Sequence, residues 1–457
     1  MSAPSTIIYQ VLTRLWGRGL FQSFDKASFD YFKSLGVTHI WYTGIIRHAS
    51  GKDFVKGNPG CPYSISDYFD VNPYLAKDPG RRIDEFRNLV RRTHRAGLKV
   101  LIDFIPNHVS RDYCDERGGI ARCGYFDYDW SDTDKIDYNA PGTWEKMRDI
   151  LLYWLGMGVD GFRCDMIELV PRDFFHWVTA QIREQYPECM FIGEAYDRGN
   201  YRNFIEYAGF DLLYDKSGIY DTLKSIVTEH TGAESISWNW QFLGDLQPHM
   251  LNFLENHDEV RLASHEFAGT PERGYSSLAV ASLLNTAPFM LYFGQELGED
   301  AYGEGNCRTS IFNWTTVNSF LKPNKSVLSR YRECLALSKR PAFAVGNIHD
   351  LGYCSSFDRS RYFAWLRYCE PSSGSASACD AISGSDEEAY LVVASFSETE
   401  EAVCVHIPGH LPLAPLSSSE TAFPSGGDAQ YLIKDDGFDV TVEVKPYDFT
   451  VLKLRLK

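Results

Sequence analysis

Short apolar runs alternate with amphipathic helical segments along the first 340 residues of the chain. They are nearly continuous in apolar residues, as is typical of strands buried on both faces of a parallel sheet. The runs cover residues 7–12, 37–42, 99–104, 158–165, 190–193, 210–213, 250–254 and 289–293. Helical patterns separate most of these runs, as in residues 26–35, 82–96, 144–157 and 172–185. Eight such strands predict an α/β protein with a closed parallel (β/α)8 barrel, the TIM-barrel fold.

Two segments depart from this alternation. Residues 109–143 follow the third strand, are rich in Asp, Gly and Tyr, and are too long for an ordinary connection, so they predict a small lobe over the barrel mouth. Beyond about residue 340, alternating strands follow one another without helices, which predicts a C-terminal antiparallel β-sandwich domain of residues 341–457. Within it, the Ser-, Gly- and Ala-rich residues 371–385 predict a surface hairpin loop. The barrel is then expected to comprise residues 1–108 and 144–340.

Charge and composition narrow the classes of partner. A formal net charge of −16 argues against a nucleic-acid partner. No run of about 18 apolar residues occurs, so we expect no membrane partner. The polar start of the chain lacks the pattern of a signal peptide, which predicts a cytoplasmic protein. The 11 cysteines are therefore expected to be free thiols, although Cys114 and Cys123 could pair in an oxidising compartment.

Polar side chains stand at four of the predicted strand ends. They are Asp103, Asn107 and His108 after the third strand, Arg163 and Asp165 on the fourth, Glu194 after the fifth, and residues 255–258 after the seventh. A parallel barrel carries its functional site at the carboxyl ends of its strands, so we expect these groups to meet at one mouth. Several acids, two histidines and an arginine at one mouth are hard to explain as packing alone.

Arg163 and Asp165 point to the same side of their strand, because the side-chain period of a strand is two. A neighbouring guanidinium keeps a carboxylate ionised and fixes its direction. Taken alone, the pair is either a structural ion pair or an oriented nucleophile.

Several other acids are expected at the same mouth as Asp165. Clustered carboxylates push each other's pKa apart, so one can be ionised while another keeps its proton. Cleavage of a glycosidic bond needs this combination, because one carboxylate attacks the sugar and the other protonates the leaving oxygen. Metal binding is the competing use of clustered acids. The arginine among them disfavours a cation at the same place.

Four short motifs at these strand ends resemble those of the α-amylase family of glycoside hydrolases, family thirteen. They read DFIPNH at 103–108, GFRCD at 161–165, GE at 193–194 and FLENHD at 253–258. The segments PYSISDY at 62–68 and YFGQE at 292–296 also resemble elements of that family. The order and spacing of the motifs match across most of the first 340 residues. The resemblance also implies a C-terminal β domain.

The resemblance implies a role for each matching residue. Asp165 would be the nucleophile, Glu194 the general acid/base, and Asp258 the acid that holds the sugar hydroxyls and distorts the ring. The implied substrate-binding residues are Tyr63, Asp67, His108, Arg163, Glu168 and His257, with Arg163 orienting Asp165 and Tyr63 stacking on the sugar. Asp103 is expected to support the site. Retention of anomeric configuration is implied, with the carboxyl groups of Asp165 and Glu194 about 5–5.5 Å apart.

A structural calcium ion is a further expectation from the family, with Asn107 as a ligand. Many members carry a Lys-His pair after the nucleophile, whereas Glu168 and Leu169 stand here. That departure weakens both the calcium inference and the contact with sugar beyond the cleavage point. The lobe contains acids that could supply oxygen ligands or could simply be solvated, namely Asp112, Asp115, Asp127, Asp129, Asp132 and Asp134.

We therefore expect a retaining glycosidase that acts on α-glucosidic bonds, α-1,4 above all, in starch-like glucans or maltooligosaccharides. A transglycosylase on the same scaffold is the alternative within the family. A non-catalytic, amylase-like carbohydrate-binding protein is the alternative from another class, but it would be expected to lack one of the three acids. The motifs do not predict chain-length preference, endo or exo action, or oligomeric state.

Overall fold

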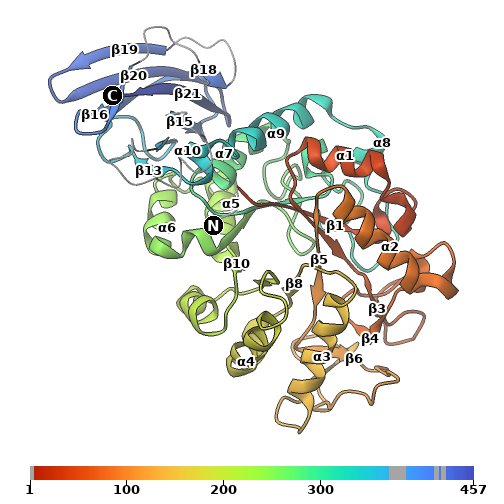
Figure 1. Ribbon diagram of the computed structural model, residues 1–457. Coiled ribbons are helices and arrows are strands. Elements are labelled where there is room, and N and C mark those ends of the chain that lie inside the picture. Colours follow the sequence, from red (N-terminus) through yellow and green to blue (C-terminus); the bar gives the residue numbers. More distant parts are fainter. Residues whose placement is uncertain (1–4, 370–387, 416–420, 424–428) are drawn as a thin grey trace.

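The computed structural model describes residues 5–369, 388–415, 421–423 and 429–457. Eight parallel strands close into a barrel in the order β1-β12-β11-β10-β9-β8-β5-β2 (Figure 1). Their bounds are Ile7–Leu12 (β1), His39–Thr43 (β2), Lys99–Phe104 (β5), Gly161–Cys164 (β8), Met190–Gly193 (β9), Leu212–Tyr214 (β10), Met250–Phe253 (β11) and Phe289–Tyr292 (β12). Every strand predicted from an apolar run takes part, which confirms the (β/α)8 fold.

Helices surround the barrel. They are α1 (Lys26–Ser34), α2 (Arg82–Arg95), α3 (Thr143–Leu155), α4 (Arg172–Arg183), α5 (Asp221–Thr228), α6 (Ser235–Leu243), α7 (Tyr275–Leu283), α8 (Asn318–Leu321), α9 (Lys325–Leu337) and α10 (Pro341–Ala344). The helix α2 illustrates why they form where they do. Its buried residues Phe86, Leu89, Val90 and Thr93 recur every three or four positions and so share one face.

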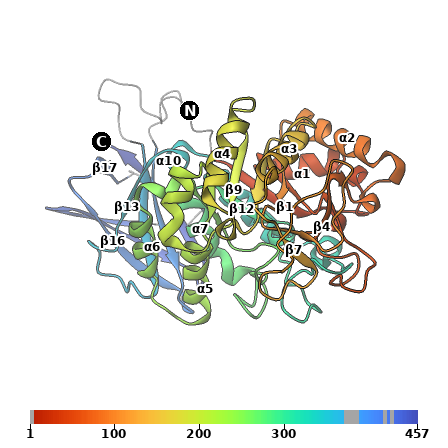
Figure 2. The ribbon, with the colours of Figure 1, turned by 90° about the horizontal axis from the view of Figure 1, so that it is seen from below.

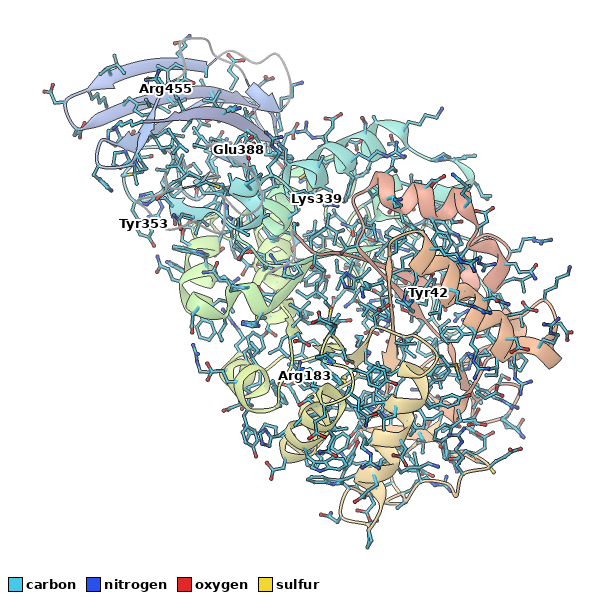
Figure 3. The ribbon with its side chains drawn as sticks, viewed as in Figure 1. Tyr42, Arg183, Lys339, Tyr353, Glu388 and Arg455 are labelled. Carbon is cyan, nitrogen blue, oxygen red and sulfur yellow. The ribbon has the colours of Figure 1, made fainter. Side chains whose placement is uncertain are left out.

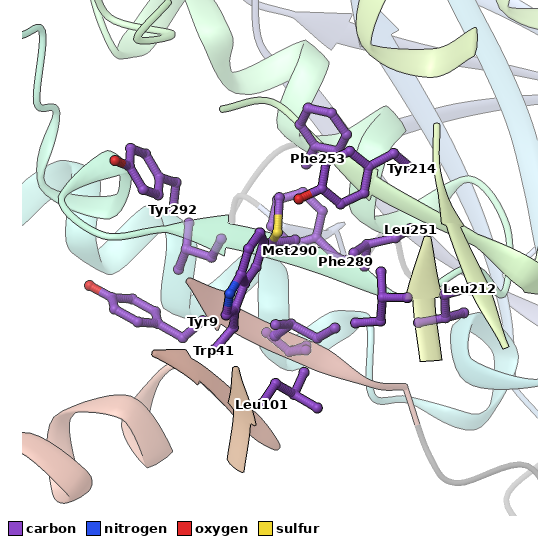
Figure 4. Packing of buried hydrophobic residues seen from close by; sticks show 14 of the residues in the cluster. Tyr9, Trp41, Leu101, Leu212, Tyr214, Leu251, Phe253, Phe289, Met290 and Tyr292 are labelled. Carbon is purple, nitrogen blue, oxygen red and sulfur yellow. The ribbon is translucent and has the colours of Figure 1, made fainter. Parts of the chain in front are cut away.

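Large apolar side chains fill the barrel interior. Trp41, Leu101, Leu212, Leu251 and Phe289 come from five strands and lie between them (Figure 4). Each of them is buried. A filled barrel leaves no room for a substrate inside, so chemistry has to take place at the mouth.

Two small antiparallel pairs stand beyond the barrel strands. The strand β3 (Ile46–His48) pairs with β4 (Ile65–Val71), and β6 (His108–Ser110) pairs with β7 (Thr133–Lys135). The second pair belongs to the segment predicted as a lobe, and the first has no counterpart in the sequence prediction. Figures 1 and 2 show these pairs on the side of the barrel away from the C-terminal domain.

The C-terminal part consists of two antiparallel sheets. One contains β13 (Asn347–Asp350), β14 (Tyr362–Tyr368), β15 (Ala389–Ser395), β17 (Leu413–Ala414), β18 (Thr421–Phe423) and β21 (Phe449–Leu456). The other contains β16 (Glu401–Pro408), β19 (Ala429–Lys434) and β20 (Gly437–Val444). Residues of both sheets, such as Leu391 and Val405, share one buried core, as in a sandwich. The predicted hairpin loop at 371–385 lies outside the described residues.

Arg367 joins this domain to the barrel. Its side chain is 1% exposed and donates to the backbone oxygens of Leu284, Ala342 and Phe343, at 3.2, 3.0 and 2.8 Å. These carbonyls lie at or near the C-terminal ends of α7 and α10, which attract a positive charge. Burial lowers the pKa of Arg367 to about 9. Buried Glu388 also lies at this junction and pairs with Arg340 (Figure 3).

The state of the cysteines agrees only in part with the expectation of free thiols. Among the described residues nine cysteines are free thiols, including exposed Cys114 and Cys123. Cys369 is disulfide-bonded, so the prediction of free thiols is wrong at that position. Within the described ranges, none of the helices is long and apolar enough to cross a membrane.

The contacts of Arg367 predict a stability effect. The substitution Arg367→Met should leave three carbonyls without a donor and lower the free energy of unfolding by about 2–4 kcal/mol. Denaturant unfolding followed by circular dichroism measures this. Exposed Arg455 of β21 is a matched control, because Arg455→Met should change the stability by less than about 0.5 kcal/mol. Equal effects of the two substitutions would contradict the role of Arg367.

Candidate active site

Arg163 stands at the centre of the mouth. Its guanidinium is fully buried and lies 2.7 Å from Asp165 Oδ1, 2.8 Å from Glu194 Oε2 and 3.7 Å from Asp103 Oδ1. Its Nε donates to the hydroxyl oxygen of Tyr214 at 3.2 Å. One cation thus faces three carboxylates from three neighbouring strands. Arg163, which was predicted to bind substrate, is not among the residues that line the cleft, and its contacts are with the acids.

Strand register explains this convergence. In the pairing of β5 with β8, Asp103 is opposite Arg163, and in that of β8 with β9, Cys164 is opposite Gly193. Glu194 follows directly, and its backbone N–H donates to the carbonyl of Cys164 at 3.0 Å. Gly193 allows the close approach of its neighbours, since a Cβ there would lie 2.5 Å from Ile167 Cδ1.

The backbone after Asp165 takes an unusual conformation. Met166 has φ 42° and ψ 50°, in the left-handed region that residues with side chains rarely adopt. In this conformation its N–H donates to Glu194 Oε2 at 2.9 Å. Strain of this kind persists where the surroundings impose it, often at functional sites. Here it supplies a donor to Glu194 from the residue next to Asp165.

Asp165 and Glu194 influence each other's protonation. Burial raises the pKa of both carboxyl groups, and Arg163 opposes this rise. The charge of Asp165 raises the pKa of Glu194 further. Because one guanidinium cannot fully compensate two buried carboxylates and nearby Asp103, we conclude that the Asp165–Glu194 pair retains a proton more readily than ordinary acids do.

Asp258 has a different environment. Its carboxylate is 41% exposed and lies 2.9 Å from Nε2 of His257. Loss of solvent around the carboxyl group raises its pKa, but His257, Arg163 and Arg308 outweigh this and lower the pKa to about 2. Gln10 Nε2 lies 2.8 Å from His257 Nδ1, so an amide donor there leaves the ring proton on Nε2, facing Asp258. The site therefore combines an ionised acid with a pair that holds a proton.

Aromatic side chains form one wall of the site. The ring of Tyr63 stacks on His257 with centroids 4.9 Å apart and an interplanar angle of 15°. The hydroxyl of Tyr63 and the indole N–H of Trp41 donate to Asp103 at 3.3 and 3.1 Å. Asp103 is thus engaged with internal partners, which agrees with a supporting role.

A cleft of about 550 Å³ opens above these groups. It brings together the three predicted acids and three of the predicted substrate-binding residues, Tyr63, His108 and His257. Burial lowers the pKa of His108 to about 4. The lining residues are Lys56, Cys61, Tyr63, His108, Asp129, Trp130, Asp132, Thr133, Asp165, Met166, Glu194, Tyr196, His257, Asp258, Ile311 and Phe312.

Sequence reasoning missed Tyr196 and Trp130. The hydroxyl of Tyr196 donates to Glu194 Oε1 at 2.6 Å. Its position two residues after Glu194 was a signal that could have been used. Trp130 packs against His108 with ring centroids 5.2 Å apart. Trp130 belongs to the lobe, and no local sequence pattern predicts its contact with His108.

Two expected substrate contacts lie elsewhere. Asp67 sits within β4, outside the cleft lining, and accepts from the backbone N–H of Phe69 at 2.8 Å. Glu168 accepts from the N–H of Asp197 at 2.8 Å and so supports the loop after β9. Glu255, two residues after β11, forms a buried ion pair of 2.8 Å with Arg261.

The residues expected to hold calcium do not fit that ion. Asn107 turns its amide nitrogen, not its oxygen, towards Asp127 Oδ2 at 2.9 Å. The ammonium of Lys135 lies 2.9 Å from the same carboxylate. Among the residues that the structure describes, no group of three or more His, Cys, Asp or Glu side chains is arranged to hold a metal. We therefore assign no step to a metal ion.

The chain is similar to proteins of known families. The family model "Alpha amylase, catalytic domain" matches residues 26–118 and 121–325. Alpha-amylase 3 of Dictyoglomus thermophilum is 22% identical over 324 residues, which cover 63% of this chain and 62% of that protein. The intracellular maltogenic amylase of Bacillus subtilis is 22% identical over 335 residues, covering 68% and 53%. The chain thus spans less than two thirds of either relative.

A solved structure shows the same fold. The crystal structure of a noncanonic maltogenic alpha-amylase, AmyB, from Thermotoga neapolitana superposes with a TM-score of 0.76 at 21% identity, covering 100% of both chains. The family match extends over more than half of the chain and includes all four strand-end motifs. This protein belongs to the α-amylase family and carries that family's catalytic domain.

Proposed function

We propose that the protein is a retaining glycosidase that cleaves α-glucosidic bonds, α-1,4 links above all, in starch-like glucans or maltooligosaccharides. The observation that carries the proposal is the contact of one buried guanidinium with both Asp165 and Glu194, at 2.7 and 2.8 Å. Retaining cleavage needs two carboxyl groups close together, one ionised and one protonated.

In the proposed reaction Asp165 attacks the anomeric carbon while Glu194 gives its proton to the leaving glycosidic oxygen. The bond to the leaving sugar breaks and a covalent bond to Asp165 forms. Glu194, now ionised, then removes a proton from water, which attacks the same carbon and releases Asp165. Two displacements restore the original anomeric configuration.

The remaining groups suit a neutral sugar. Ionised Asp258 accepts hydrogen bonds from hydroxyl groups, and the ring proton of His257 holds that acid in place. Tyr63 offers an aromatic face at the cleft. The charge of Arg163 is paired with Asp165 and Glu194 of the protein itself, and a neutral sugar needs no further ionic partner.

Water and a second sugar can compete for the covalent intermediate. We favour water as the acceptor, in line with the relatives named amylases. Transglycosylation is the alternative outcome, and the products distinguish the two. With end-labelled maltooligosaccharides we expect shorter products to dominate, whereas longer products formed faster than short ones would contradict hydrolysis.

A cytoplasmic location is part of the proposal. It is supported by the similarity to an intracellular maltogenic amylase of Bacillus subtilis and by the nine free cysteines among the described residues. The disulfide at Cys369 argues against it, because disulfides are rare in a reducing compartment.

The nucleophile assignment predicts the effect of Asp165→Asn. Turnover of maltooligosaccharides should fall by at least about a thousandfold, because no carboxylate remains to attack. Asp173→Asn is a control, since Asp173 is exposed on α4. For the smaller variant Asp165→Ala, added azide should restore turnover and yield a glycosyl azide of β configuration. An α-configured azide would instead indicate that Asp165 is the acid/base.

Tyr196 predicts a shift in the pH profile. Its hydroxyl stabilises ionised Glu194, so Tyr196→Phe should raise the pKa of Glu194 above its already raised value. The acid must be protonated for the first step, so the alkaline limb of kcat/KM should move to higher pH, with a fall of about tenfold at the optimum. Tyr125→Phe, on an exposed lobe tyrosine, should leave the profile unchanged. An alkaline limb that stays in place would contradict this contact.

A further inference from the structure

Several acids of the lobe form ion pairs with lysines or an arginine of the same chain. The pairs are Asp115 with Lys146 at 2.9 Å, Asp127 with Lys135 at 2.9 Å, Asp132 with Lys56 at 3.8 Å and Asp134 with Arg122 at 3.1 Å. Four of the six acids that could have supplied calcium ligands thus already have a positive partner. The pair of Lys56 and Asp132 lines the cleft itself, whereas the pair of Lys135 and Asp127 lies next to His108, a cleft residue.

Lys135 occupies a defined place at the end of β7. In the pairing of β6 with β7 it is directly opposite His108. Its Nζ donates to both oxygens of Asp127, at 3.1 and 2.9 Å. The side chains of Lys135 and Asp127 are only 20% and 18% exposed, so the pair is shielded from most of the solvent.

The pair sets the orientation of the Asn107 amide. An ionised carboxylate accepts hydrogen bonds and cannot donate them, so Asp127 requires Asn107 to present its NH2 group. This is the orientation found, with Asn107 Nδ2 donating to Asp127 Oδ2 at 2.9 Å. With the amide turned round, two oxygens would face each other.

The same amide nitrogen reaches His108. Asn107 Nδ2 lies 3.3 Å from His108 Nδ1. Because the Asn107 amide donates to Nδ1, this ring nitrogen is the acceptor, and the ring proton of His108 is on Nε2. Because His108 lines the cleft, its tautomer and its ring orientation matter for any sugar that binds there. The chain of contacts therefore runs from Lys135 through Asp127 and Asn107 to His108.

We propose that Lys135 is a built-in cation that replaces a structural calcium ion between lobe and barrel and positions His108 through Asp127 and Asn107. An ammonium group and a calcium ion both compensate a carboxylate, but only calcium needs several oxygen ligands around it. The buried Oδ1 of Asn107 has no hydrogen-bond partner among the described residues. Binding of a calcium ion at this oxygen would raise the Tm in Ca²⁺, which the first test measures.

The first test measures thermal unfolding of the wild-type protein with excess EDTA and with millimolar Ca²⁺. We expect the two Tm values to agree within about 1 °C, because a ligand that does not bind the native state does not stabilise it. A higher Tm in Ca²⁺, or a lower one in EDTA than in untreated protein, would overturn the replacement of calcium.

The second test compares Lys135→Met with Lys146→Met. Both remove a lysine from a lobe ion pair, so both should lower Tm. Only Lys135→Met should also lower kcat/KM for a maltooligosaccharide, by about tenfold at a temperature where both variants are folded. Equal kcat/KM values for the two variants would overturn the positioning role.

A double-mutant cycle shows whether the effect passes through His108. In a His108→Ala background, Lys135→Met should cause no further loss of kcat/KM, whereas an undiminished tenfold loss would contradict the proposed route. If Lys135→Met does not fold, Lys135→Met combined with Asp127→Asn removes both charges and should recover a folded protein. That double variant should keep the low kcat/KM, and wild-type kcat/KM in it would also overturn the proposal.

The positioning part of this inference rests on the proposed function, whereas the replacement of calcium does not. If the wild-type protein failed to cleave maltooligosaccharides, the proposed function would fail. The Tm measurements in EDTA and Ca²⁺ would still decide the role of Lys135 as a cation.

Discussion

The buried charge of Arg163 is the interaction on which the site depends. A guanidinium without solvent is costly unless carboxylates and hydrogen-bond acceptors surround it. Asp103, Asp165 and Glu194 supply the carboxylates, and Tyr214 accepts from Nε. The acids in turn lose solvent, and Arg163 limits the resulting rise in their pKa. Barrel closure makes this exchange possible, because it brings three strand ends to one point.

The mouth separates its acids into two environments. Asp165 and Glu194 are buried and share one cation, so their pKa values rise together. Asp258 is partly exposed and has His257 beside it, so its pKa falls to about 2. Chemistry that needs one protonated and two ionised acids can follow from burial and neighbours alone, without any unusual residue type.

In the lobe, too, cations of the chain lie next to the acids. Four of its acids are compensated by lysines and an arginine that lie close to them in space, as in the pair of Lys135 and Asp127. Internal cations of this kind are attached to the chain and are always present, whereas a metal ion has to be bound from solution. In the structure Lys135 contacts Asp127, Asp127 accepts a hydrogen bond from Asn107, and the Asn107 amide lies 3.3 Å from His108 Nδ1.

The sequence by itself determined the barrel, the C-terminal sheets and the meeting of Asp165, Glu194 and Asp258. These follow from periodicity and from the position of residues at strand ends, which are local properties. The short pairs β3–β4 and β6–β7 were less visible, because brief strands in polar segments carry little periodic signal. Only the tertiary structure decided which partner each charged group takes. Asp67 and Glu168 bind backbone N–H groups of their surroundings, Trp130 reaches His108, and Lys135 pairs with Asp127. Such contacts join residues on different segments, and their geometry depends on how the whole chain packs.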